Sequence, residues 1–280
     1  MAGAPGQGAQ VRGRLTFAAG CALVGLVLAV ALVSLVWLPY DPADTTGGRL
    51  APPGGAHLLG TDKLGRDLLT QLMAGARTAL IAGIGSVLVG GLLGVTGGLL
   101  AGFATRWLDD ALSAALDIVI AFPTLLLAML VAAAREASLG SVVLAIGLGM
   151  SAIVARLTRV LVKRVLAQDY ITAARTSGTS WPRIVAEHVL PNIWPMLLVN
   201  LALQLGLAVL AEAALSYLGL GPPPPNASWG RLLQEAQATV LTAPTGAIAP
   251  GVLLVVLVVG TNLVADGLRD LADPTRRRSR

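Results

Sequence analysis

The chain has few charged, aromatic, cysteine and histidine residues for its 280 positions. Charged residues make up only 12% of it and hydrophobic residues 55%, with a mean hydropathy of +0.76. A water-soluble globule of this composition would have too few polar side chains to cover its surface. The shortage of charge therefore argues against a soluble protein and predicts an integral membrane protein.

The scarcity of cysteine, histidine and lysine excludes several kinds of site. Cys21 is the single cysteine and lies in an apolar run, so no disulfide or multi-thiolate metal site can form within the chain. His57 and His188 fall on opposite sides of the membrane in the topology derived below, so they cannot share a zinc ion. Neither Lys63 nor Lys163 lies in a phosphate-binding Gly-x-x-x-x-Gly-Lys-Ser/Thr loop. We expect no metal, no cofactor and no catalytic residue on this chain.

Long apolar runs dominate what the chain does contain. A helix needs roughly 20 apolar residues to cross the hydrocarbon core of a bilayer. Six runs are long enough, which predicts an all-α integral membrane protein with six transmembrane helices, at 15–38, 78–103, 111–134, 137–155, 192–214 and 246–265. The first run is too long for the apolar part of a cleavable signal peptide, so we expect it to remain as a span.

The basic residues predict the orientation of these spans. If the N-terminus is cytoplasmic, 14 of the 20 Lys and Arg residues fall on the cytoplasmic side and six on the other. Basic residues favour cytoplasmic loops, so both termini are expected in the cytoplasm. The net charge of +5 is then explained by the orientation of the spans in the membrane, and no nucleic-acid partner is indicated. The predicted segments are a tail at 1–14, the first helix at 15–38, an external segment at 39–77, a five-helix core at 78–268 containing a cytoplasmic loop at 160–191, and a basic tail at 269–280.

Small residues recur at every fourth position in the second run. Such spacing allows helix backbones to approach closely in lipid. The pattern predicts tight helix packing through Gly90, Gly94, Gly98 and Gly102.

Four polar side chains within the runs are candidates for a translocation pathway: Asp117, Asn200, Gln204 and Glu212. Polar groups in a membrane are costly and commonly mark a pathway or a buried partner. Asn200 and Gln204 are four residues apart and share a helix face. Hydrogen bonding between helices explains these two amides equally well, and Glu212 could simply lie at the membrane interface. The residues alone leave both interpretations open.

Two segments are expected on the external side. Residues 39–77 are rich in proline and glycine and lead into a helix with Thr61 or Asp62 as its cap, although a surface for an external partner is an alternative. In the second segment, four prolines precede Trp229, which is expected to open a short amphipathic helix at the membrane interface.

Residues 170–192 form the one long polar and basic interruption in the second half of the chain. Arg175, Arg183 and Glu187 lie there beside an apolar stripe that includes Trp181 and Ile184. The pattern predicts an amphipathic surface element between two spans. Such an element could dock a partner outside the membrane or could lie passively at the interface.

This interruption resembles the signature cytoplasmic loop of ABC importer permeases. The family pattern is Glu-Ala-Ala, three residues, Gly, nine residues, then Ile-x-Leu-Pro. The matching positions here are Thr172, Ala173 and Ala174, then Gly178, then His188, Leu190 and Pro191. The spacing matches completely, but Thr172 replaces the usual Glu and His188 the usual Ile. The missing Glu removes an acidic contact that the family would make with its ATPase.

Three further segments are similar to the second permease subunit of the dipeptide, oligopeptide and nickel branch of this family. They are Leu59–Leu69 with Gly75–Leu80, Glu212–Gly230, and Asn262–Pro274. Together with the loop, the resemblance covers nearly the whole chain.

The resemblance implies a type I ABC importer permease architecture, in which the loop is a coupling helix that docks in a groove of an ATPase. The coupling residues it implies are Thr172, Ala173, Ala174, Gly178, Trp181, Ile184, His188, Leu190 and Pro191. Gly178 would permit the bend between two short helices, and Leu190 and Pro191 would end the second. The implied partners are a homologous second permease, two cytoplasmic ATPases that hold ATP and Mg, an extracytoplasmic solute-binding protein and the lipid bilayer of a prokaryotic inner membrane.

Di- or oligopeptides are the implied cargo, with nickel or another small solute as the alternative. A secondary transporter or channel that uses Asp117, Glu212 or Asp266 is a rival from another class. A membrane-embedded enzyme is a third possibility. Neither rival accounts for the spacing of the loop.

Overall fold

The computed structural model describes residues 5–224 and 226–272, and this part of the chain is helical with no β-strand. The long helices are α1 (Pro5–Val36), α2 (Leu68–Phe103), α5 (Leu139–Leu166), α8 (Leu190–Tyr217) and α10 (Thr245–Ala272). The shorter helices are α3 (Arg106–Ala121), α4 (Thr124–Ala133), α6 (Asp169–Thr176), α7 (Trp181–Ile184) and α9 (Trp229–Ala236). A π-helical turn, Val185–Val189, joins α7 to α8, and a 3-10 turn, Gln237–Thr239, follows α9.

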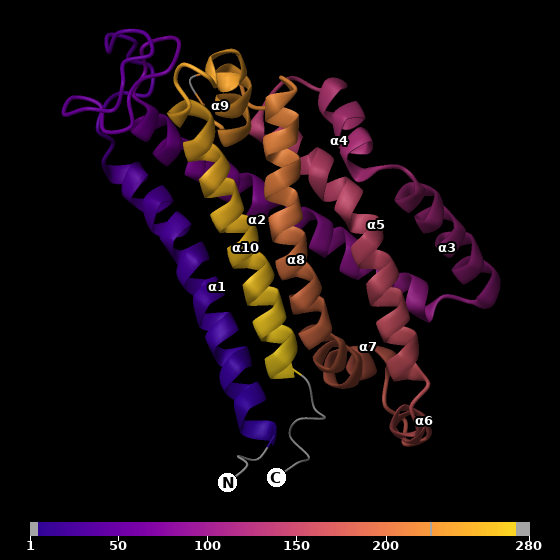
Figure 1. Ribbon diagram of the computed structural model, residues 1–280. Helices are drawn as coiled ribbons and strands as arrows, with labels where there is room; N and C mark the ends of the chain where they lie inside the picture. The colour runs from indigo at the N-terminus through magenta and orange to yellow at the C-terminus, as the bar shows by residue number, and fades with distance from the viewer. Residues whose placement is uncertain (1–4, 225, 273–280) are drawn as a thin grey trace.

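The long helices form an elongated bundle (Figure 1). Five helical segments are long and apolar enough to cross a membrane, and the bent pair α3–α4 makes a sixth if counted as one span. The start of α1 and the end of α10 lie at the same end of the bundle as α6 and α7, which we call the terminal end (Figure 1). The segment 37–67 and α9 lie at the opposite end, which we call the loop end (Figure 1).

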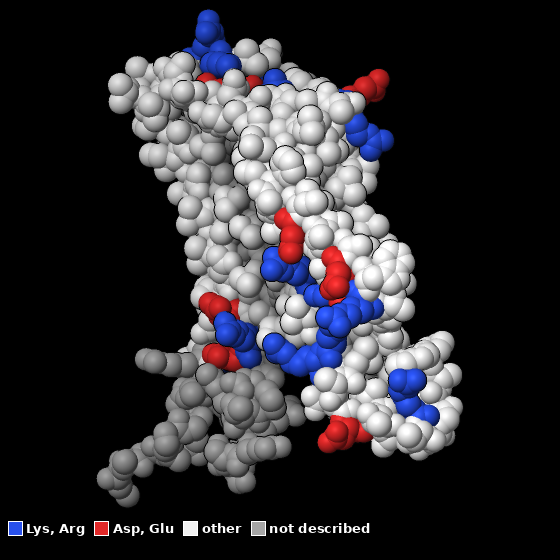
Figure 2. Space-filling view, turned by 90° about the vertical axis from the view of Figure 1, so that its right-hand side faces the viewer, with Lys and Arg blue, Asp and Glu red and all other residues white. Residues whose placement is uncertain are grey.

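The outer surface of the bundle is apolar along its length. Large side chains such as Leu92 on α2, Leu130 on α4 and Val255 on α10 are more than half exposed. Figure 2 shows charged side chains at the upper end of one face and from its middle downward, with an uncharged band between the two groups. Such a surface suits contact with lipid hydrocarbon.

Several helices extend beyond the predicted spans. Residues 5–14 continue α1 before its predicted span, α5 continues to Leu166, past the predicted end of its span at 155, and α10 continues through 269–272. Residues 1–4 and 273–280 of the predicted tails lie outside the described residues. An apolar run marks the part of a helix that suits hydrocarbon, whereas capping and packing decide where the helix ends.

The start of α2 illustrates this difference. The helix begins at Leu68, ten residues before the predicted span, because the Asp67 side chain accepts a hydrogen bond from the Thr70 N–H at 2.7 Å. Thr61 and Asp62, the predicted caps, instead close the preceding loop. The Thr61 hydroxyl donates to the Gly48 carbonyl, and Asp62 accepts from the Leu64 and Arg66 backbone N–H groups.

The predicted third span at 111–134 is broken. Helices α3 and α4 meet at an angle of 86° around Phe122 and Pro123. Proline has no backbone N–H, and it pushes the preceding residue out of the helical region; Phe122 accordingly has an extended backbone with ψ of 132°. The apolar composition predicted one straight helix, and this proline divides it.

The glycine stripe of α2 lies against α5. A Cβ atom built on Gly90 would be 2.9 Å from the Gly147 carbonyl oxygen, and one on Gly94 would be 2.5 Å from the Val154 Cβ. Gly98 and Gly102 make equally close approaches, to Ala155 and Val162. The two helices are therefore in backbone-to-side-chain contact over several turns, which only glycine permits.

We predict that Gly98→Ala destabilises the bundle and that Gly97→Ala does not. The added methyl at 98 would lie 2.5 Å from the Ala155 carbonyl oxygen, whereas at 97 its nearest neighbour is 4.0 Å away. Overpacking of this kind costs about 1–3 kcal/mol. Thermal unfolding of the purified proteins in detergent should show a lower midpoint for Gly98→Ala alone. Equal midpoints for the two variants would contradict the packing account.

A second glycine contact, not predicted from the sequence, joins α1 to α10. A Cβ atom on Gly20 would be 2.6 Å from the Val264 nitrogen, and one on Gly267 would be 2.5 Å from the Phe17 Cβ. The contacting glycines are seven residues apart on each helix, at 13 and 20 on α1 and at 260 and 267 on α10. This spacing places each pair on one face of its helix.

Candidate docking loop and pathway residues

Two short helices, α6 and α7, form a compact loop at the terminal end of the bundle (Figure 1). Gly178 connects them with a φ of +83°, in the left-handed region that favours glycine. Its N–H donates to the Arg175 carbonyl, and the Thr179 N–H donates to the Ala174 carbonyl, both at 3.0 Å. These bonds close the end of α6 and fix the direction in which α7 begins.

The apolar side of this loop is buried against the bundle. Ile171, Ile184 and Val189 are at most 1% exposed, and they pack with side chains of α2, α5 and α8. Trp181 lies edge-on to Phe103, with ring centroids 5.3 Å apart, while the Arg175 guanidinium lies 4.3 Å from the Trp181 ring centroid. The loop is therefore rigidly attached to the ends of the long helices.

The opposite side of the loop is exposed and small. Thr172, Ala173 and Gly178 are exposed, and Ala174 is half-buried. A Cβ atom on Gly178 would meet nothing within 4 Å. Arg183 and Glu187 form an exposed ion pair at 2.8 Å beside them. A partner protein could therefore approach the backbone of this loop closely.

The sequence analysis expected Leu190 and Pro191 to end the second short helix, but the structure shows that they do not. The Leu190 N–H donates to the Val185 carbonyl, so the turn between them is π-helical and widened by one residue. Pro191 lies in the first turn of α8, and its missing N–H removes one backbone hydrogen bond next to the π-helical turn. The chain thus runs as one helical segment from Trp181 to Tyr217. A movement of α7 can be transmitted directly to α8.

His188 lies on the π-helical turn and is half-buried. Its ring centroid is 6.0 Å from that of Tyr170 in an edge-on arrangement, which connects this turn to α6. The backbone carbonyl of His188 accepts a hydrogen bond from the Asn192 side chain at 2.6 Å. His188 therefore helps to tie the two short helices together.

The four pathway candidates lie in different surroundings. Asp117 on α3 forms an exposed ion pair with Arg156 of α5 at 3.2 Å. Glu212 is fully buried, and one of its oxygens accepts hydrogen bonds from Ser216 at 2.7 Å and from Ser228 at 2.8 Å. These contacts direct Glu212 toward the start of α9.

Asn200 and Gln204 differ from Glu212 in their surroundings. Gln204 is buried and lines a cavity between α4, α5 and α8. Asn200 is half-buried, and its side-chain oxygen has no hydrogen-bond partner among the described residues. Only Gln204, of the four candidates, lines this cavity.

A charged cluster between α3 and α5 was missed in the sequence analysis. Asp109 is 5% exposed and accepts hydrogen bonds from Arg159 at 2.5 and 2.9 Å and a further one from Lys163. Together with the pair of Asp117 and Arg156, it attaches α3 to α5 along one face. The sequence did hold a signal, because Arg156, Arg159 and Lys163 of α5 recur three and four positions apart, while Asp109 and Asp117 of α3 are eight apart.

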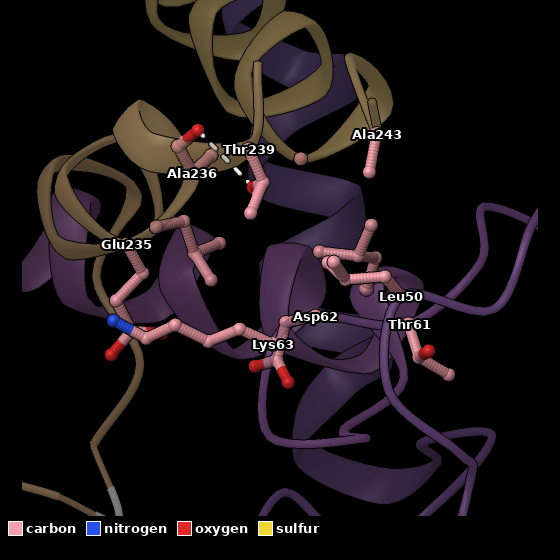
Figure 3. A pocket seen from close by; sticks show the side chains of 11 residues that line it. Leu50, Thr61, Asp62, Lys63, Glu235, Ala236, Thr239 and Ala243 are labelled. Carbon is pink, nitrogen blue, oxygen red and sulfur yellow. Dashed lines mark hydrogen bonds between the residues drawn. The ribbon is translucent and has the colours of Figure 1, made fainter. Parts of the chain in front are cut away.

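The loop end is held together by a second charged cluster. The Arg66 guanidinium donates to Asp62 and to Glu235 of α9, both at 2.6 Å, and Arg231 also donates to Glu235 at 3.0 Å. Figure 3 shows residues of the 37–67 segment facing residues of α9 across a small pocket. The segment is therefore a folded part of the protein, fixed to α9.

Trp229 opens the short helix α9, as the sequence analysis expected, but its side chain packs inside the bundle. It is fully buried, and its ring nitrogen donates to the Leu72 carbonyl at 3.0 Å. Gly75 of α2 leaves the space for the ring, since a Cβ there would be 2.7 Å from Trp229 Cδ1. An amphipathic pattern shows that one face of α9 is buried, and here α2 and α8 cover that face instead of lipid.

The fold is that of a multi-pass membrane protein with an exposed two-helix loop at one end of its helix bundle. The chain belongs to the family of binding-protein-dependent transport system inner membrane components, whose sequence pattern matches residues 94–278. The matched range includes α5, the α6–α7 loop, α8 and α10. The match confirms the resemblance to ABC importer permeases.

Curated relatives extend the similarity to most of the chain. A dipeptide transport system permease protein of Alkalihalophilus pseudofirmus is 36% identical over 90% of this chain and 85% of its own length. A nickel transport system permease protein of Escherichia coli K12 is 36% identical over 90% of this chain and 91% of its own length. A glutathione transport system permease protein of Pectobacterium atrosepticum is 38% identical, with coverages of 94% and 88%.

Proposed function

We propose that this chain is one of two permease subunits of an ATP-driven importer and lines half of the pathway for di- or oligopeptides. The observation that carries the proposal is the α6–α7 loop, which is buried on its apolar side and exposes small residues around Gly178 on the other. A small, rigid surface of this kind suits a groove on a partner. The dipeptide and glutathione relatives favour a peptide as the cargo, and the nickel relative keeps a metal cargo as the alternative.

In this proposal the terminal end faces the cytoplasm and the loop end faces the outside. The basic residues of α5 and of the α6–α7 loop support this orientation, because cytoplasmic segments are enriched in Lys and Arg. The partners are two ATPases that hold ATP and Mg, a homologous second permease, and an extracytoplasmic binding protein that delivers the peptide at the loop end. This chain itself would hold no nucleotide and perform no catalysis.

Coupling would follow from the continuous helix between the loop and α8. Closure of the ATPases around ATP would displace α7, and the segment Trp181–Tyr217 would transmit that displacement to the cavity beside Gln204. ATP and the loaded binding protein would then favour the same arrangement of the spans, which is how two ligands become coupled.

The rival secondary transporter has less support from the geometry. Asp117 is neutralised by Arg156, and Glu212 is buried under two serine hydroxyls. Neither carboxylate lines the cavity beside Gln204. Proton or ion coupling would need a carboxylate that the transported solute can reach.

Purification of the tagged chain in mild detergent from its native host tests the proposal. We expect an ATPase and a second permease to accompany it, and we expect uptake by membrane vesicles to require ATP. A stable complex without any ATPase, or uptake that collapses with the proton gradient while ATP is present, would overturn the proposal.

A further inference from the structure

The cavity between α4, α5 and α8 combines apolar walls with one polar group. Its volume is about 350 Å³. Leu125 of α4, Ile146 and Met150 of α5, and Leu207 of α8 contribute to the walls, and Gln204 is the only polar side chain among the lining residues. Sites for small organic ligands typically have this volume and this pattern of apolar walls with few polar groups.

Gln204 has unused hydrogen-bonding capacity. Its side chain is 4% exposed, yet it makes no side-chain hydrogen bond to another residue in the described part of the chain. Its polar atoms are not enclosed by the described residues, so they remain open to the cavity. A carboxamide carries both a donor and an acceptor, so it can pair with a ligand that offers both, as a peptide bond does.

The cavity offers no charge to a ligand. Its lining residues include no Asp, Glu, His, Lys, Arg or Cys. Glu212, two turns along α8, is directed toward Ser216 and Ser228, and Asp117 is paired with Arg156. Nickel ions in proteins are held by imidazole, thiolate or carboxylate groups, and none of these lines the cavity.

We infer that this cavity is a subsite of the transport pathway for a neutral peptide unit, with its apolar walls around the side chain and Gln204 hydrogen-bonded to the peptide bond. The inference rests on the proposed transport function and adds a specificity-determining residue to it. It also separates the two cargoes suggested by the relatives, because the lining suits a peptide and not a nickel ion.

The test uses membrane vesicles from cells that express the complete transport system. Uptake of radiolabelled alanyl-leucine is measured for wild type, Gln204→Leu and Asn262→Leu. Leucine is close to glutamine in size, so Gln204→Leu removes the polar atoms while leaving the cavity filled. Asn262→Leu is the matched control, because it removes an exposed amide on α10 that does not line the cavity.

We expect Gln204→Leu to lower alanyl-leucine uptake about tenfold, the effect of losing one well-placed hydrogen bond to a buried group. Asn262→Leu should keep uptake within about twofold of wild type. A third variant, Ala211→Asp, places a carboxylate in the cavity and should shift preference from alanyl-leucine toward alanyl-lysine.

The outcomes separate this inference from the proposed function. Unchanged uptake by Gln204→Leu, with an intact complex and active wild type, would overturn the subsite alone. Loss of the second permease from purified Gln204→Leu would also overturn it, since the cavity would then be a contact between subunits. Wild-type vesicles that take up ⁶³Ni²⁺ but no peptide would instead contradict the peptide cargo itself.

Discussion

Gly178→Asp should leave the protein inserted in the membrane and assembled with its second permease, but should abolish ATP-dependent uptake. The loop around Gly178 is exposed, and a Cβ at this position meets nothing within 4 Å. The fold therefore has room for the side chain. The added carboxylate would lie on the surface that we propose to dock with the ATPase, where an unpaired charge buried at an interface is costly.

The control for this experiment is Gly178→Asn, which separates charge from backbone strain. Both Asp and Asn tolerate the left-handed conformation better than other side chains do, at a cost of about 1 kcal/mol relative to glycine. Equal losses of uptake in the two variants would show that backbone strain or side-chain bulk, and not charge, is responsible. Unchanged uptake in both would remove the loop from the mechanism.

Trp229→Ala should destabilise the protein more than any other single truncation at the loop end. The ring is fully buried between α2 and α9, and its nitrogen donates to the Leu72 carbonyl. Removal of a buried tryptophan side chain costs about 3–5 kcal/mol, because it leaves a cavity and removes a hydrogen bond. The midpoint of thermal unfolding of the purified chain in detergent should fall markedly.

Trp229→Phe serves as the matched variant, since it keeps most of the ring and removes the hydrogen bond. Its free energy of unfolding should fall by roughly 1–2 kcal/mol, much less than that of Trp229→Ala. If Trp229→Ala unfolds at the wild-type temperature, then α9 is not anchored through this ring, and the packing described above would be wrong in its main contact.

Much of the loop could be predicted from the sequence, because the residue pattern that identifies it is local. The spacing from Thr172 through Gly178 to Pro191 identified the segment, and the apolar stripe with Ile184 identified its buried side. The expected end of the helix at Pro191 was wrong, because the same residue can end one helix or open the next. The choice depends on the hydrogen bond from Leu190 to Val185, which the sequence does not encode locally.

Contacts between segments far apart in the sequence were the hardest to predict. Asp109 pairs with Arg159 across 50 positions of sequence, and Arg66 pairs with Glu235 across 169. The four pathway candidates looked alike in sequence, as polar residues in apolar runs. Their surroundings differ because the neighbouring helices, and not their own helix, supply the partners.

By itself the sequence determined that this protein belongs in a membrane, roughly which segments are long and apolar enough to cross it, and which family it belongs to. Those properties follow from composition, run length and spacing along the chain, which are local quantities. Only the tertiary structure decided that Trp229 is a core residue, that Pro123 breaks a span and that Gln204 lines a cavity while Glu212 does not. Burial and hydrogen bonding depend on which helices come together, and that arrangement is a property of the whole bundle.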